Sequence, residues 1–152
     1  MRTQFALIVM LPLLLLAAPV SPGVAEEATD TREPAPRTDA EKAFVLEQMR
    51  LFLASITEIE NALGSGDMDQ VAREAAARGR KANVTLARPP SLATKESEAW
   101  RMMMGSARTG FDQIAEQAAA RAPAAQINKT LADTMLNCVA CHQAYRITVD
   151  AR

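Results

Sequence analysis

The apolar residues of this chain recur at alternating steps of three and four positions in four successive segments. The first segment carries Val45, Met49, Phe52, Ile56, Ile59 and Leu63. Such a heptad-like stripe forms the buried face of an amphipathic helix. No segment alternates with the period of two that indicates a half-buried strand. The pattern predicts an all-α chain, and four helices with short connections favour an antiparallel four-helix bundle.

The residues that flank these stripes set the expected limits of the helices. Thr38 and Glu41 have the spacing of a capping box, and Gly64-Ser65-Gly66 follows the first stripe. We expect helices over 38–63, over 67–86 with Asp67 as the cap, from Thr94, and from about Pro123 nearly to the chain's end. The later stripes are Met68, Val71, Ala75, Gly79 and Ala82; Trp100, Met104, Ala107, Phe111, Ile114 and Ala118; and Ile127, Leu131, Thr134, Cys138, Cys141 and Tyr145.

The amino-terminal residues have the features of a secretory leader. Arg2 precedes an uncharged run from Phe5 to Val20, and Gly23-Val24-Ala25 places small residues at a cleavage site. An uncleaved membrane anchor is the alternative, but the run is shorter than the roughly 20 apolar residues of a spanning helix. We therefore expect a signal peptide over 1–25, a disordered or extended lead-in over 26–38, and the bundle over 39–152. The leader predicts export to the periplasm.

The charge of the chain is nearly balanced. Lys and Arg number 17 against 18 Asp and Glu, for a formal net charge of −1. This balance argues against a nucleic-acid-binding protein, which carries a basic excess or a basic face. The one basic cluster, Arg78-Gly79-Arg80-Lys81, is interpreted as a solvated helix end.

The two cysteines and the single histidine of the chain lie within five residues. They form the pattern Cys138-Val139-Ala140-Cys141-His142, a C-x-x-C-H. In an exported protein this pattern is typical of covalent haem attachment. Residues three apart on a helix are surface neighbours, so both sulfurs can reach the two vinyl groups on one porphyrin edge. The adjoining His142 can then bind the iron as the proximal ligand.

Three other chemistries use closely spaced cysteines. A thioredoxin-like pair is expected near a βαβ pattern, which is absent from this sequence. A structural zinc site needs four nitrogen or sulfur ligands, and the chain offers three. A disulfide between Cys138 and Cys141 would strain a helix and leave the histidine unexplained. Covalent haem is therefore favoured.

The residues from Cys138 to Arg146, CVACHQAYR, resemble the carboxy-terminal motif of the class II c-type cytochromes, which include cytochrome c′. The resemblance extends over roughly residues 39–148, by pattern more than identity outside the motif. It implies a four-helix bundle with one covalent haem c near the end of the fourth helix. It also implies that Arg146 contacts a haem propionate, although an ordinary solvated charge is an equal alternative. Members of this class are often dimers through their first two helices, so the resemblance also implies a homodimer.

The residue opposite His142 decides the chemistry of the iron. Depth along a four-helix bundle leaves Met49 and the trio Met102, Met103 and Met104 as candidate ligands. The resemblance favours Met49, because class II cytochromes take the distal residue from the first helix. A methionine in a heptad stripe is also an ordinary core residue, in which case the sixth position stays open.

These observations predict a periplasmic monohaem electron carrier that exchanges electrons with redox partner proteins. A methionine opposite histidine gives a low-spin iron with a raised potential. The alternative is a gas-binding protein like cytochrome c′, which takes nitric oxide or carbon monoxide at a five-coordinate iron. No nucleophile or acid–base pair is recognisable, so we do not expect an enzyme.

Overall fold

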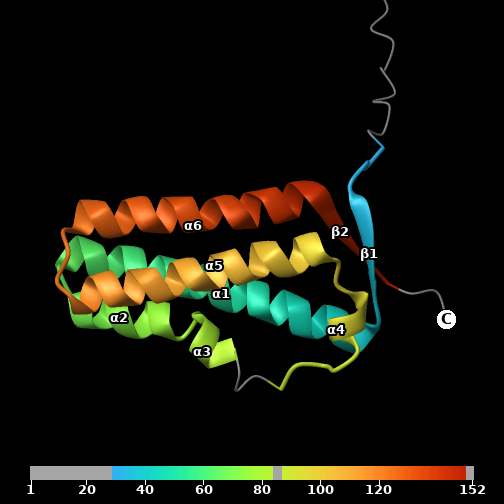
Figure 1. The fold of residues 1–152 in the computed structure, drawn as a ribbon, viewed down its shortest axis with the longest axis horizontal. Helices are drawn as coiled ribbons and strands as arrows, with labels where there is room; N and C mark the ends of the chain where they lie inside the picture. Colours follow the sequence, from blue (N-terminus) through green and yellow to red (C-terminus); the bar gives the residue numbers. More distant parts are fainter. Residues whose placement is uncertain (1–28, 84–86, 150–152) are drawn as a thin grey trace, which may run out of the picture. The chain divides into compact units, whose positions relative to one another are not determined.

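A computed structural model describes residues 29–83 and 87–149 (Figure 1). Within them the helices are α1 (Asp39–Ser65), α2 (Met68–Ala76), α3 (Arg80–Asn83), α4 (Leu92–Lys95), α5 (Glu98–Ala119) and α6 (Ala124–Ala144). The strands are β1 (Glu33–Arg37) and β2 (Tyr145–Val149). The chain is mostly helical, as the all-α prediction requires. The expected leader over 1–25 lies outside the described residues, and every element named above lies in the unit that begins at Thr31.

The predicted limits of the first helix are confirmed. The Thr38 hydroxyl accepts from the Glu41 amide at 3.3 Å, and the Glu41 carboxylate accepts from the Thr38 amide at 2.8 Å. These two bonds complete the capping box. Gly66 ends the helix with a left-handed φ of 77°, a conformation that glycine adopts without steric cost. The start of α6 directly after Pro123 is also as predicted, but this helix ends at Ala144 and Tyr145 begins β2, so its expected extent nearly to the chain's end was wrong.

The second predicted helix, over 67–86, is broken, so its expected extent was wrong. Asp67 caps it as expected, but α2 ends at Ala76 and the short α3 starts at Arg80. Between them the backbone passes close to Asp112 of α5, whose carboxylate accepts from the Arg80 amide at 3.1 Å. A side chain at Gly79 would overlap that carboxylate. A contact with a distant helix therefore interrupts this one.

The third long helix starts at a different residue from the one predicted. Thr94 lies inside the single turn of α4, and the chain is extended at Glu96. The hydroxyl of Ser97 instead accepts from the Trp100 amide at 3.2 Å and caps α5. Thr94 and Ser97 are both acceptable cap residues, so local preference alone could not separate them.

The two strands correct the expectation that the chain has none. β1 pairs in parallel with β2, with Glu33 opposite Tyr145 and Arg37 opposite Val149. β1 falls within the segment expected to be a disordered or extended lead-in, and it is extended but paired. Pro34 and Pro36 of β1 have no amide hydrogen to donate to a neighbouring strand. An edge strand tolerates this, and both strands of a two-stranded sheet are edge strands. The pairing fixes the segment before α1 against the segment after α6.

The long helices pack through their predicted stripes. α5 contacts both α2 and α6, and α1 contacts α2. α1 and α5 begin at the end of the unit where α6 finishes (Figure 1). The main core is formed by Phe52, Ile59, Ala62, Leu63, Val71, Ala75, Phe111, Ile114, Ala118, Ile127 and Leu131. A second cluster, formed by Ala35, Val45, Leu92, Trp100 and Cys141, lies near β1 and β2. Among the described residues, no helix is both long and apolar enough to cross a membrane.

Two glycines of α5 should respond in opposite ways to the same substitution. A Cβ at Gly110 would overlap the Thr134 side chain of α6, whose hydroxyl is held by the Thr130 carbonyl at 2.7 Å. We expect Gly110→Ala to lower the free energy of unfolding by about 1–3 kcal/mol through overpacking. Gly105→Ala meets nothing within 4 Å and should raise it by about 1 kcal/mol through helix propensity. Denaturant unfolding measures both, and equal effects would contradict the close approach of α5 and α6.

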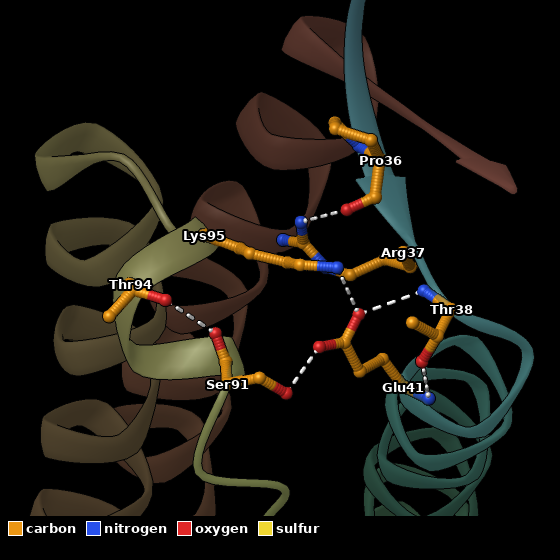
Figure 2. A network of polar contacts seen from close by, with 7 residues as sticks. All are labelled: Pro36, Arg37, Thr38, Glu41, Ser91, Thr94 and Lys95. Atoms are coloured by element: carbon orange, nitrogen blue, oxygen red, sulfur yellow. Dashed lines mark hydrogen bonds and ion pairs between the residues drawn. The ribbon is translucent and has the colours of Figure 1, made fainter. Parts of the chain in front are cut away.

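A buried carboxylate joins the start of α1 to α4 (Figure 2). Glu41 is only 2 % exposed. It accepts from the Ser91 hydroxyl and, at 2.9 Å, from the Lys95 ammonium. The Ser91 bond above all, then those from Lys95 and the Thr38 amide, lower the pKa of Glu41 to about 2. The network holds the segment around α4 against α1.

The lowered pKa makes this network pH-dependent. The unfolded chain binds a proton at Glu41 near pH 4.5, whereas the folded chain does so near pH 2. The stabilisation is therefore complete above about pH 4.5 and declines as the pH falls toward 2. We expect Glu41→Gln to lower the thermal midpoint at pH 7, and the gap from the unsubstituted chain to narrow by pH 3. A gap that stays constant across a pH series of thermal melts would contradict this.

Candidate functional site

An apolar cavity of about 320 Å³ lies among α1, α5 and α6. Its lining is almost free of polar surface. The lining residues are Met49, Arg50, Phe52, Leu53, Ile56, Met103, Met104, Ala107, Met135, Asn137, Cys138, Cys141 and His142. The cavity thus brings Cys138, Cys141 and His142 of the sequence motif together with Met49, which lies 89 residues before Cys138 along the chain.

The last turns of α6 place the motif at the cavity. Cys138 and Cys141 are one turn apart, with Cys141 buried and Cys138 half-buried, while His142 is exposed. The helix ends where the Tyr145 amide donates to the Cys141 carbonyl. The Arg32 guanidinium donates to the His142 carbonyl at 3.2 Å. The motif therefore lies in the last turns of α6, directly before β2, and Arg32 next to β1 contacts its last residue.

Burial keeps both cysteine thiols neutral. It raises the pKa of Cys138, and it raises the pKa of Cys141 with a further contribution from the neighbouring Cys138. Both are free thiols. A redox-active cysteine pair instead has a thiolate stabilised by a positive environment. The surroundings of these thiols therefore argue against the thioredoxin-like alternative.

The structure narrows the candidate methionines without choosing one. Met49 of α1 lines the cavity, as do Met103 and Met104 of α5. Met102 does not, and its side chain is 60 % exposed. Met135 lines the cavity from α6, the helix that carries His142. The thioether of Met49, Met103 or Met104 is therefore available to a soft metal centre.

Two other residues singled out in the sequence lie apart from the cavity lining. Arg146 donates through Nε to the Arg32 carbonyl at 3.3 Å. Trp100 packs edge-on against Tyr145, with ring centroids 5.2 Å apart, and the Arg37 guanidinium lies 5.1 Å from its ring centre. The Tyr145 hydroxyl is 2.9 Å from the Ser97 hydroxyl that caps α5. These contacts tie the start of α5 to the end of α6.

Sequence reasoning missed two polar residues of the lining, Arg50 and Asn137. Each is the chain neighbour of a predicted site residue, so each lies at the edge of an apolar stripe. Arg50 pairs with Glu47 at 2.6 Å, and the Asn137 amide donates to the Thr134 carbonyl at 3.1 Å. Their position beside Met49 and Cys138 was the available signal.

Comparisons with known proteins identify no relative of this chain. No protein-family model, no curated protein and no solved structure matches the chain. Among the side chains of residues 29–83 and 87–149, no group of three or more His, Cys, Asp and Glu is placed to hold a metal ion.

Proposed function

We propose that this chain is an electron carrier of the class II c-type cytochrome kind, with one covalent haem. Cys138 and Cys141 would hold the haem through thioethers, and His142 would bind the iron. The observation that carries the proposal is the lining of one apolar cavity by both cysteines, the only histidine of the chain, and a methionine from another helix.

The residues around the cavity fit such a group. Its volume of about 320 Å³ is at the lower end of the roughly 300–1,000 Å³ usual for small-molecule sites, so it would take part of a haem and leave an edge outside. Neutral thiols are available for thioether formation, and the imidazole of His142 is exposed rather than committed to the core. Phe52, Ile56 and Ala107 supply apolar surface that excludes water. When bound, haem supplies one-electron exchange between ferric and ferrous iron.

The helix arrangement supports the finer fold proposal of an antiparallel four-helix bundle. We assign α1, α2 with α3, α5, and α6 as its four helices. α2 follows α1 after a two-residue turn, and α6 follows α5 after a similarly short connection. Short connections make neighbouring helices antiparallel. In this arrangement the attachment motif occupies the last turns of the fourth helix.

We propose that Met49 would be the second side chain to bind the iron, as the resemblance implies. It enters the cavity from α1, whereas His142 enters from α6. Met103 and Met104 line the cavity from a third helix, α5, so the choice of Met49 follows the resemblance to class II cytochromes and not the cavity alone. A methionine–histidine pair raises the reduction potential and suits electron transfer. This assignment favours the carrier over the gas-binding alternative.

The cavity opens toward solvent on its α1 and α6 sides. Leu53 of α1 and Met135 of α6, which both line it, are 65 % and 38 % exposed. An exposed haem edge would let electrons cross to a redox partner without further enclosure. The predicted leader over 1–25 fits this role, because c-type haem attachment in bacteria takes place outside the cytoplasm.

Visible absorption spectra of the haem-loaded, exported protein test the proposal. We expect a far-red ferric band typical of sulfur ligation and a ferrous spectrum that carbon monoxide leaves unchanged. A high-spin ferric spectrum and a prompt carbon monoxide adduct would contradict the carrier and favour the gas-binding alternative. Absence of covalent haem after expression with a cytochrome maturation system would contradict both.

A further inference from the structure

A second cavity, of about 510 Å³, adjoins the apolar one. Met49 and Met104 line both, so these two side chains form part of the wall between them. The second cavity differs in the charge of its lining. Five basic residues contribute to it: Arg80, Lys81, Arg88, Arg101 and Arg108. We refer to it as the basic cavity.

The positive charge of the basic cavity is largely uncompensated. Glu96 is the single carboxylate among its lining residues, and it pairs with Arg88. In the part of the chain that the structure describes, Arg80, Lys81, Arg101 and Arg108 form no ion pair. Arg80 and Lys81 belong to the basic cluster that the sequence suggested was a solvated helix end. Both residues are exposed, as that interpretation expects, and folding also brings them to the same cavity as Arg101 and Arg108 of α5.

Arg108 is a buried cation that forms no ion pair within 4 Å among the described residues. Its side chain is 8 % exposed, and its guanidinium donates to the Arg78 carbonyl at 3.1 Å. Its pKa is lowered by burial first and then by the nearby charges of Arg78 and Arg88, while the nearby Asp112 carboxylate acts in the opposite direction. A buried charge beside like charges is costly unless something compensates it. The Asp112 carboxylate and the Phe52 ring, whose centre is 5.1 Å from the guanidinium, compensate part of that cost, and an anion in the cavity would add to this compensation.

We propose that the basic cavity binds an oxyanion, namely a carboxylate or phosphate group. The planar guanidinium groups of Arg80, Arg101 and Arg108 match the geometry of such a group. Two sources share this chemistry. One is a free solute anion; the other is a propionate of a haem in the adjoining cavity, and only that second source rests on the proposed function.

Calorimetric titration with inorganic phosphate, and separately with citrate, tests the proposal at low ionic strength. The titrations use the full chain with and without attached haem. We expect Arg80→Gln/Arg101→Gln to weaken binding at least tenfold. Arg73→Gln, which removes one exposed charge on α2 outside the cavity, should change it less than twofold. Circular dichroism checks that each variant is folded.

The two sources give different results. Equal phosphate binding with and without haem identifies a free anion. Binding only without haem identifies the propionates. In that case the double variant should also raise the pH at which the reduction potential of the loaded chain changes slope, because the propionates lose cationic neighbours. The proposal is overturned if neither phosphate nor citrate binds and the double variant leaves the pH dependence of the reduction potential unchanged. It is also overturned if Arg73→Gln weakens binding as much as the double variant does.

Discussion

No haem should remain on the denatured chain of the Cys138→Ala/Cys141→Ala variant produced with a cytochrome maturation system. Both thiols line the apolar cavity, and the chain contains no other cysteine. The unsubstituted chain should keep one haem through denaturation, because thioether bonds survive unfolding. Haem staining of a denaturing gel and the mass of the intact chain measure this difference. We expect haem on the unsubstituted chain and none on the double variant.

The control for this variant lies inside the motif. Val139 is exposed between the two cysteines, so Val139→Ala changes the same turn of α6 without removing a thiol. It should retain full haem content. Single cysteine variants should keep haem through one remaining thioether. Covalent haem in the double variant, or none in the unsubstituted chain, would refute the assignment of the cysteines.

Met49→Leu should convert a carbon monoxide-insensitive protein into one that binds carbon monoxide promptly. The substitution removes the thioether that we assign as the sixth ligand and nearly conserves side-chain volume, so it should cost less than about 1.5 kcal/mol of stability. The reduction potential should fall on the order of 0.1 V, within the roughly 0.8 V range that axial ligands span. Ferrous spectra with carbon monoxide and a redox titration measure both effects.

Three matched variants test the choice of methionine. Met103→Leu, Met104→Leu and Met135→Leu each alter the lining of the same cavity, and all three should leave the ferrous spectrum unchanged by carbon monoxide. If Met103→Leu or Met104→Leu opens the iron while Met49→Leu does not, the ligand comes from α5. If the unsubstituted protein already binds carbon monoxide, Met49 is a packing residue.

The sequence by itself determined the features that depend on neighbours along the chain. The heptad stripes place Phe52, Phe111 and Leu131 in the core, because helical periodicity alone decides which side chains share a face. Thr38 and Gly66 fix the ends of α1 through bonds to residues within one turn. The proximity of Cys138, Cys141 and His142 likewise follows from their spacing on one helix.

Tertiary structure decided the features that depend on residues far apart in sequence. Asp112 of α5 interrupts the second helix at Gly79, and β1 forms only because β2 lies beside it. Residues from α1, α5 and α6 together enclose the apolar cavity. The basic cavity has the same origin, since Arg80 and Arg108 are brought together from segments that local sequence treats as separate. Such contacts follow from how whole helices pack, which no short window of sequence specifies.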